Sequence, residues 1–286
     1  MTLDHLRIVG QGARHTVFTD PASFPRSVYR VEKDEARNTF EECCAKLAYH
    51  QRVVSRLFGS FVPTQRIVSL GNLHVIETEY VQLGSICVEL KPKWIVHDSF
   101  VDIQQRRGYT QIFNPAGLWS RHKTEIITSL RSARSCDKPY LQIHRGDDEG
   151  EAIDLVACAL MDSEIFSVLN TIAEVSQLAS ATDCLPIAKK LVQMEKTTRL
   201  SPDVLLLEME AFVSIGKSLL TNPDPELVHK WINTYLTGRM VRDVSLMFSF
   251  STDPSELGKP IFPVGNMFCR LVVIDTELKP RSKISC

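Results

Sequence analysis

The stretch that decides the fold is Cys87-Val88-Glu89-Leu90-Lys91-Pro92-Lys93-Trp94. Its apolar residues alternate with charged ones, which is typical of a β-strand with one buried face. The other face carries Glu89, Lys91 and Lys93, and the proline stops further pairing. A charged row of this kind is most often solvated. A second apolar stretch, residues 272–280, also runs into Leu-Lys-Pro, so we expect two such strands to place carboxylates and lysines around one cleft.

The composition is that of an ordinary globular protein. The 286 residues are 44% hydrophobic and 23% charged, which suffices for one large or two moderate domains with a core. The 33 basic and 34 acidic residues leave a net charge of -1, which argues against nucleic acid as a partner. An anion site would need a local concentration of lysine and arginine, and a small, highly phosphorylated ligand fits that better than a duplex.

The eight cysteines form no C-x-x-C pair and no zinc-finger grouping. We therefore expect reduced thiols in a soluble, intracellular protein. No apolar run approaches the roughly 18 residues of a membrane span, and the N-terminal residues show no signal or transit pattern, so no membrane partner is expected. The residues favour neither the cytoplasm nor the nucleus.

Short strands around a glycine-containing turn are expected at the N-terminus. Residues 6–9 form a strand that leads into Gly10-Gln11-Gly12-Ala13, the chain is extended again over 16–18, and a third strand over 28–31 carries Arg30. Small residues in the turn would let backbone amides approach a phosphate, although a plain hairpin turn is the more common reading. Many kinases cover ATP with this order of elements.

The rest of the chain divides by periodicity. The pattern predicts a helix over residues 34–58 and strands over 65–70 and 74–80. A polar, loop-rich segment follows over residues 95–150, with a solvated acidic run at 147–151. Helices are expected across residues 154–239, and strands over 241–248 and 267–275. An antiparallel pair of the last two strands would hold Asp243 and Asp275 near each other. We expect an α+β fold with a mixed N-terminal lobe, residues 1–85, and a larger, helix-rich C-terminal lobe, residues 86–286.

Five elements of the sequence, taken together, carry a resemblance. They are Gly10-Gln11-Gly12-Ala13, Val28-Tyr29-Arg30, Glu89-Leu90-Lys91-Pro92-Lys93-Trp94, Arg242-Asp243-Val244-Ser245 and Ile274-Asp275-Thr276-Glu277-Leu278-Lys279-Pro280. In order and spacing this set resembles the inositol-pentakisphosphate 2-kinase family, most closely its short fungal forms. The Glu-x-Lys-Pro-Lys and Asp-x-x-Leu-Lys-Pro elements are the specific ones. The resemblance covers both ends of the chain and little of the helical middle.

The resemblance implies a two-lobed inositol-phosphate kinase. Such an enzyme transfers the γ-phosphoryl group of ATP to the axial 2-hydroxyl of inositol 1,3,4,5,6-pentakisphosphate, giving inositol hexakisphosphate (phytate). It also implies Mg²⁺ as the cofactor, the two small molecules as the partners, a monomer, and the nucleus as a compartment. Phosphoryl transfer needs cations at the phosphates, a magnesium ligand and a carboxylate near the attacking hydroxyl, and the chain has residues of each type.

The resemblance also implies a role for each matched residue. For the nucleotide it implies phosphate contacts from Gly10, Gly12, Ala13 and Arg30, with Glu89 and Lys91 at the nucleotide and the transferring phosphoryl group. For the inositol substrate it implies phosphate contacts from Lys91, Lys93 and Lys279, with Lys283 as a further candidate. It implies Asp243 as the base for the hydroxyl and Asp275 as the magnesium ligand.

The chain departs from the family's pattern in three places. His15 stands where the family commonly has an asparagine. Many members carry a zinc knuckle in the segment that corresponds to residues 94–114, which holds no cysteine here, so no zinc is expected. Arg106, Arg107 and Lys123 are candidates to replace the substrate contacts of that segment. The segment after the last lysine motif is also short.

Two other functions fit the same residues. The first is a kinase for a less phosphorylated inositol, and the number of cations in the cleft separates it from the pentakisphosphate enzyme. The second is a non-catalytic inositol-polyphosphate-binding protein with the same fold. The presence of both Asp243 and Asp275 argues against a binding protein, because a pure anion binder gains nothing from two carboxylates beside phosphates.

Overall fold

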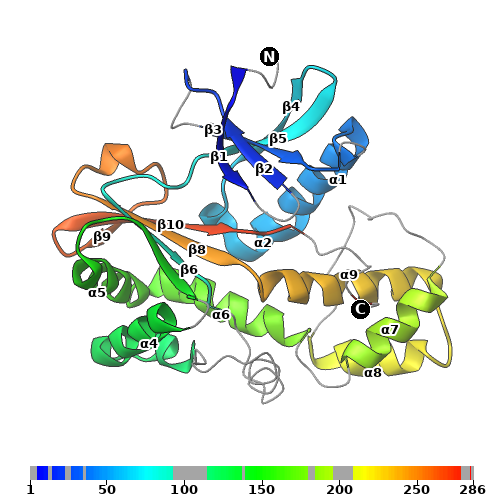
Figure 1. Cartoon of the computed structure of the whole chain (residues 1–286). Coiled ribbons are helices and arrows are strands. Elements are labelled where there is room, and N and C mark those ends of the chain that lie inside the picture. Colours follow the sequence, from blue (N-terminus) through cyan, green and yellow to red (C-terminus); the bar gives the residue numbers. More distant parts are fainter. Residues whose placement is uncertain are drawn as a thin grey trace.

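The chain folds into two antiparallel sheets and a set of helices (Figure 1). The computed structural model describes residues 5–11, 15–22, 27–34, 37–92, 115–136, 139–179, 184–195, 209–277 and 284. Within these ranges the presence of both helices and antiparallel sheets confirms the α+β class.

The first sheet contains the N-terminal strands. It consists of β1 (Arg7–Gln11), β2 (His15–Thr19), β3 (Ser27–Glu32), β5 (Leu73–Glu79) and β4 (Gln65–Leu70), in that spatial order. Helix α1 (Phe40–Tyr49) continues through a π-helical turn (His50–Val54) into α2 (Ser55–Phe58) and packs beside this sheet. The predicted helix therefore starts six residues late, at Phe40, because the Thr39 hydroxyl accepts a hydrogen bond from the backbone N–H of Glu42 and caps it.

The second sheet places the Glu89 strand in its interior. Its spatial order is β7 (Leu141–Arg145), β6 (Ile86–Leu90), β8 (Ser245–Ser251), β10 (Met267–Ile274) and β9 (Phe262–Val264). All five residues of β6 are buried, Glu89 among them. The expectation of a solvated charged row is thus wrong for Glu89, because β7 and β8 flank β6 on both edges.

The remaining helices form two apolar clusters. In chain order they are α4 (Lys123–Ser135), α5 (Glu149–Leu160), α6 (Ser163–Gln177), α7 (Cys184–Met194), α8 (Met209–Leu219) and α9 (Pro225–Val241), with single 3-10 turns at Gly59–Phe61, Pro115–Trp119 and Pro254–Glu256. The larger cluster joins the second sheet to α4, α5 and α6. The smaller one lies among α7, α8 and α9, where the rings of Phe212 and Trp231 stack with centroids 4.4 Å apart.

Three local predictions need correction. The segment 95–150 contains α4 and β7, so it is less loop-rich than its polarity indicated. The acidic run 147–151 is exposed throughout, as predicted, but from Glu149 it belongs to α5, because the Asp148 carboxylate accepts a hydrogen bond from the N–H of Glu151. The stretch 241–248 begins with the end of α9 and a turn, and only from Ser245 onward is it a strand.

The connection between the two sheets, residues 80–85, is held to β8. The Ser249 hydroxyl donates to the carbonyl of Val81, 2.9 Å away. Gly84 has a φ of 74°, and a Cβ there would lie 2.2 Å from the carbonyl oxygen of Phe250, so only glycine fits. Arg270 of β10, with a nearly buried side chain, pairs with Glu79 at the end of β5, 2.7 Å between Nη2 and Oε2. This ion pair ties the second sheet to the first.

The smaller cluster also contains a residue from the end of the chain. Ile284 is fully buried among side chains of α7, α8 and α9. The sequence pattern did not predict this anchor, because a single apolar residue in a polar tail has no periodicity.

Ile284→Ala should lower the free energy of unfolding by about 2–4 kcal/mol, because it removes buried methyl groups and leaves a cavity. Urea denaturation of the whole chain measures this. Leu185→Ala on α7 is the matched control, since Leu185 is 41% exposed, and it should cost less than about 0.5 kcal/mol. Equal losses in the two variants would contradict the anchoring of Ile284.

Candidate functional site

Three neighbouring strands bring polar residues to one end of the second sheet. Because β6 and β10 both run antiparallel to β8, their C-terminal ends meet the start of β8. Glu89 lies one residue before the end of β6, Ser245 opens β8, and Asp275 directly follows β10. The expectation that the two strands bring carboxylates together therefore holds for Glu89 and Asp275, with Ser245 between them.

The Glu89 carboxylate has a separate partner for each oxygen. Its Oε2 lies 3.1 Å from Nε2 of His144 on β7, and its Oε1 lies 3.2 Å from Nζ of Lys91. Burial disfavours the charged form and is the largest single influence on its pKa. Hydrogen bonds from His144 and Ser245 and the charge of Lys91 together outweigh burial and lower the pKa of Glu89 to about 2. The group is thus a firmly ionised carboxylate in a largely dry position.

One hydroxyl group serves both carboxylates. The Oγ of Ser245 lies 3.1 Å from Oδ2 of Asp275, and it is also within hydrogen-bonding reach of Glu89. A serine hydroxyl has one proton to donate, and an ionised carboxylate only accepts. At any moment Ser245 can donate to only one of the two acids, and Glu89 has His144 and Lys91 as further partners.

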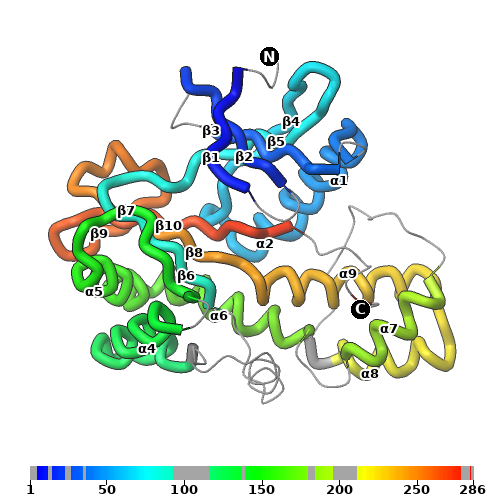
Figure 2. Tube along the Cα trace, viewed as in Figure 1, coloured from blue at the N-terminus to red at the C-terminus, as the bar shows by residue number. Residues whose placement is uncertain are grey.

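Asp275 bends the chain at the edge of the site. Its φ is 61°, and among the described residues it is the only non-glycine residue with a positive φ. Such a conformation is uncommon and clusters at functional sites, although aspartate tolerates it better than most residues. After this bend the chain turns from the second sheet toward the first, and Figure 2 shows the end of β10 beneath the N-terminal strands.

Two residues after the bend, Glu277 contacts the first sheet. Its Oε1 lies 3.4 Å from Nε2 of His15 on β2 and 3.6 Å from Nη2 of Arg30 on β3. The same His15 nitrogen lies 3.5 Å from Glu32, whose carboxylate also pairs with Lys46 of α1. A line of acidic and basic side chains therefore runs from α1 across β3 and β2 to the segment that follows β10.

The structure places the other predicted residues as follows. Asp243 is half-buried in the three-residue connection between α9 and β8, two residues before Ser245, and not on a strand as predicted. Gly10 belongs to β1, opposite Val17 at an irregularity of the pairing, and not to the turn. A Cβ on Gly10 would make only ordinary contacts, so no close backbone approach requires glycine there.

Several predicted residues lie outside the described part of the chain. These are Gly12, Ala13, Lys93, Lys279, Lys283, Arg106 and Arg107. Residues 94–114, the segment in which no zinc is expected, are also outside the described part. The roles of these residues and the absence of zinc therefore stay predictions. Lys123 is described, and it pairs with Asp154 of α5 at 2.8 Å, beside no residue of the Glu89–Asp275 group.

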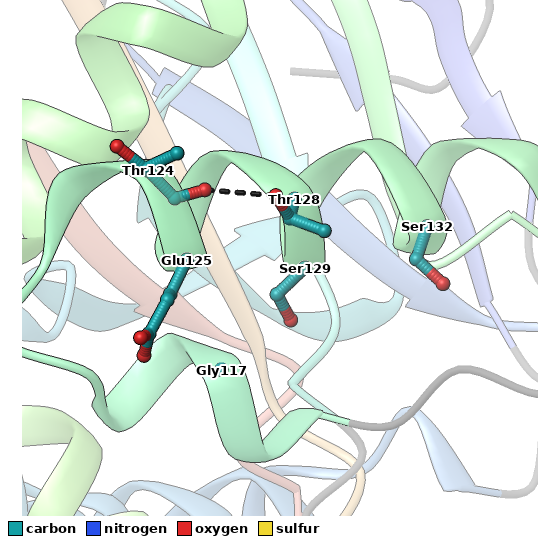
Figure 3. Close-up of a pocket in the computed structure, with 6 residues that line it drawn as sticks. All are labelled: Gly117, Thr124, Glu125, Thr128, Ser129 and Ser132. Atoms are coloured by element: carbon teal, nitrogen blue, oxygen red, sulfur yellow. Dashed lines mark hydrogen bonds between the residues drawn. The ribbon is translucent and has the colours of Figure 1, made fainter.

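A hollow of about 390 Å³ lies elsewhere, over α4 (Figure 3). The residues that line it are Gly117, Thr124, Glu125, Thr128, Ser129 and Ser132. The Thr128 hydroxyl donates to the carbonyl of Thr124 within the helix, 2.8 Å away. Its lining includes no lysine or arginine, so the hollow lacks the cations that a polyphosphate needs.

A search of protein-family models and a search of curated proteins found no match to this chain. In the described part, no three or more His, Cys, Asp and Glu residues gather as a metal-binding group. None of the described helices is both long and apolar enough to cross a membrane.

Sequence reasoning missed two partners of the site, His144 and Glu277. His144 lies in the segment 95–150, and its contact with Glu89 joins residues 55 positions apart. Glu277 was noted only as part of a motif, and its contacts depend on the bend at Asp275. No local pattern marks either residue, because both act through pairing between distant strands.

The low pKa of Glu89 predicts a pH-dependent stability. A carboxylate whose pKa falls from 4.5 unfolded to about 2 folded stabilises the fold above pH 4.5, and this contribution is lost as the pH drops toward 2. Glu89→Gln cannot titrate, so between pH 5 and pH 2 the wild type should lose about 3 kcal/mol more unfolding free energy than the variant. Urea titrations at four pH values measure the difference, and parallel profiles would contradict it.

Proposed function

We propose that this protein is a magnesium-dependent kinase that transfers the γ-phosphoryl group of ATP to the 2-hydroxyl of inositol 1,3,4,5,6-pentakisphosphate. The observation that carries the proposal is the meeting of Glu89, paired with Lys91, and Asp275 at one end of the second sheet, opposite Arg30 of the first. This arrangement offers cations and carboxylates of the kind that phosphoryl transfer uses.

ATP would bind between the two sheets, which we propose to be the cores of two lobes, residues 1–85 and 86–286. Arg30 points from β3 toward Glu277, on the side where β10 ends, and would hold ATP phosphates. Gly10, Gly12 and Ala13 would cover them with backbone amides. The Arg270–Glu79 pair supports the two-lobed arrangement, since it lies where the chain passes from one sheet to the other.

The residues present fit a magnesium ion. Mg²⁺ in kinases is usually held by one or two carboxylates together with substrate phosphates and waters. Asp275 supplies one carboxylate, which within the described part of the chain accepts a hydrogen bond from Ser245. Bound there, the ion would neutralise charge on the β- and γ-phosphates. We also propose that the protein binds no zinc.

Asp243 would act as the base for the attacking hydroxyl. Its turn connects α9 to β8 and lies two residues before Ser245, whose hydroxyl donates to Asp275, and this supports the assignment. Lys93 follows Lys91 by two residues and Lys279 follows Asp275 by four, so both sequence positions flank the site. We propose that they grip substrate phosphates, with Lys283 as a further contact. The nucleus and a monomeric state belong to the proposal through the resemblance alone.

A non-catalytic inositol-polyphosphate-binding protein is the second candidate. The observation that favours it is the contact of Glu277 with Arg30, because the cation proposed for ATP already has a carboxylate beside it. A protein that binds inositol phosphates without ATP would keep such a contact permanently.

One assay separates these functions. The protein is incubated with Mg²⁺, ATP and inositol pentakisphosphate, and the products are resolved by anion-exchange chromatography. A hexakisphosphate product supports the proposal. Product formed only from less phosphorylated inositols would identify the other kinase. Tight binding of the pentakisphosphate with no product from any inositol would favour the binding protein.

The two aspartates should differ in their mutant kinetics. Asp243→Asn should lower kcat by roughly 10²–10⁴ and leave Mg-ATP affinity near wild type, because a general base acts chiefly in the transition state. Asp275→Asn should lower kcat and also raise the magnesium requirement, because a metal ligand stabilises the bound nucleotide as well. Steady-state kinetics over a magnesium series, with melting temperatures as the control for folding, measure both effects. Near-normal turnover in Asp243→Asn would remove it from the catalytic role.

Glu277→Gln should tighten the binding of ATP in the absence of Mg²⁺ about two- to fivefold, because it removes an anion that competes for Arg30 and His15. The magnitude is that of a partly exposed ion pair. Calorimetry with EDTA present measures it. Glu226→Gln on the first turn of α9 is the control, since it removes the same charge from an exposed position. An equal gain in both variants would assign the effect to net charge.

A further inference from the structure

His144, which contacts Glu89, lies at an irregularity in the pairing of β7 with β6. From Leu90 the pairing of β6 with β7 runs Leu90–Leu141, Glu89–Gln142 and Val88–Ile143, and it then moves to Cys87–Arg145. One residue of β7 is therefore left without a partner in the register, and it is His144. A β-bulge of this kind redirects a side chain and often lies next to a functional site.

The bulge delivers a hydrogen-bond donor to one oxygen of Glu89. The carboxylate is ionised and can only accept, so the Nε2 atom of His144, 3.1 Å from Oε2, must carry the proton of this contact. The other oxygen, Oε1, remains directed at Lys91. Each oxygen has its own cationic or N–H partner, and this division fixes the rotation of the carboxylate.

Among the described residues, the side chains that hydrogen-bond the Glu89 carboxylate are those of His144, Lys91 and Ser245, and its register partner Gln142 is not one of them. Ser245 on β8 is shared with Asp275, and Cys87 on the same face of β6 is a buried thiol whose pKa burial raises to about 11. His144 is the residue of β7 that hydrogen-bonds the carboxylate, and its side chain is 28% exposed, so it borders the open side of the site.

We propose that His144 is a positioning residue, which holds the Glu89 carboxylate in the rotation that keeps the Lys91 ammonium group directed at the transferring phosphoryl group. This inference rests on the proposed kinase function and deepens it. His144 touches neither substrate nor nucleotide in this role. It acts through Glu89, and nothing in the motif that contains Glu89 and Lys91 indicates it.

Two variants of similar size test the role. Glutamine carries an N–H group at about the reach of Nε2, whereas methionine fills similar space without a donor. His144→Met should lower kcat about 10- to 100-fold with the KM for ATP changed less than about threefold, the loss typical of a misplaced catalytic group or a removed supporting contact. His144→Gln should recover most of that loss. His122→Met, at an exposed histidine before α4, should leave kcat unchanged.

A second measurement does not depend on turnover. In protein with ¹³C-labelled lysine, relaxation of the Lys91 side chain should show greater mobility in His144→Met than in wild type or His144→Gln. Equal Lys91 mobility in all three folded proteins overturns the inference, and so does equal kcat in wild type and His144→Met. A wild type without any kinase activity counts against the proposed function. The Lys91 mobility then decides by itself whether His144 positions the lysine.

Discussion

The burial of the Glu89 carboxylate is the constraint on which the site depends. A lone carboxylate in an apolar interior is very costly, and removal of one partner of a buried ion pair costs about 3–5 kcal/mol. Glu89 is tolerated because β7 and β8 flank its strand and supply His144 and Ser245, while Lys91 supplies the charge. The burial of the Glu89 carboxylate therefore depends on the strand order β7-β6-β8. The same order supplies the hydrogen-bond donors that keep the carboxylate ionised.

A second constraint joins the two sheets. Arg270 lies on β10 with a nearly buried guanidinium and reaches Glu79 at the end of the first sheet. The connection that follows Glu79 lies so close to β8 that only glycine fits at position 84, against the backbone of Phe250. Both contacts lie where the chain crosses between the sheets, and on the opposite side, where β10 ends, Glu277 contacts His15 and Arg30 of the first sheet.

Acidic and basic side chains alternate across that opposite side. Lys46, Glu32, His15, Glu277 and Arg30 form a continuous series of unlike neighbours. Pairs of this kind that are partly exposed contribute little to stability individually. Their consequence is that the Arg30 guanidinium is held with the Glu277 carboxylate beside it, so its surroundings depend on the segment after Asp275.

The sequence by itself determined the elements whose signal is local. Alternation located β4, β5 and β6, and three-and-four spacing indicated the helical region that contains α5 to α9, because these patterns follow from the geometry of a single element. The two strands that end in Leu-Lys-Pro also predicted that their carboxylates lie together, and Glu89 and Asp275 do lie on either side of Ser245. Only the tertiary structure decided what depends on pairing between distant segments. The bulge that presents His144 to Glu89, the bend at Asp275 that sends Glu277 to Arg30, and the turn that takes Asp243 off the predicted strand each depend on register and backbone direction. Neither the register nor the backbone direction can be read from the order of residues, since a shift of one residue changes the face and the neighbours of every side chain in a strand.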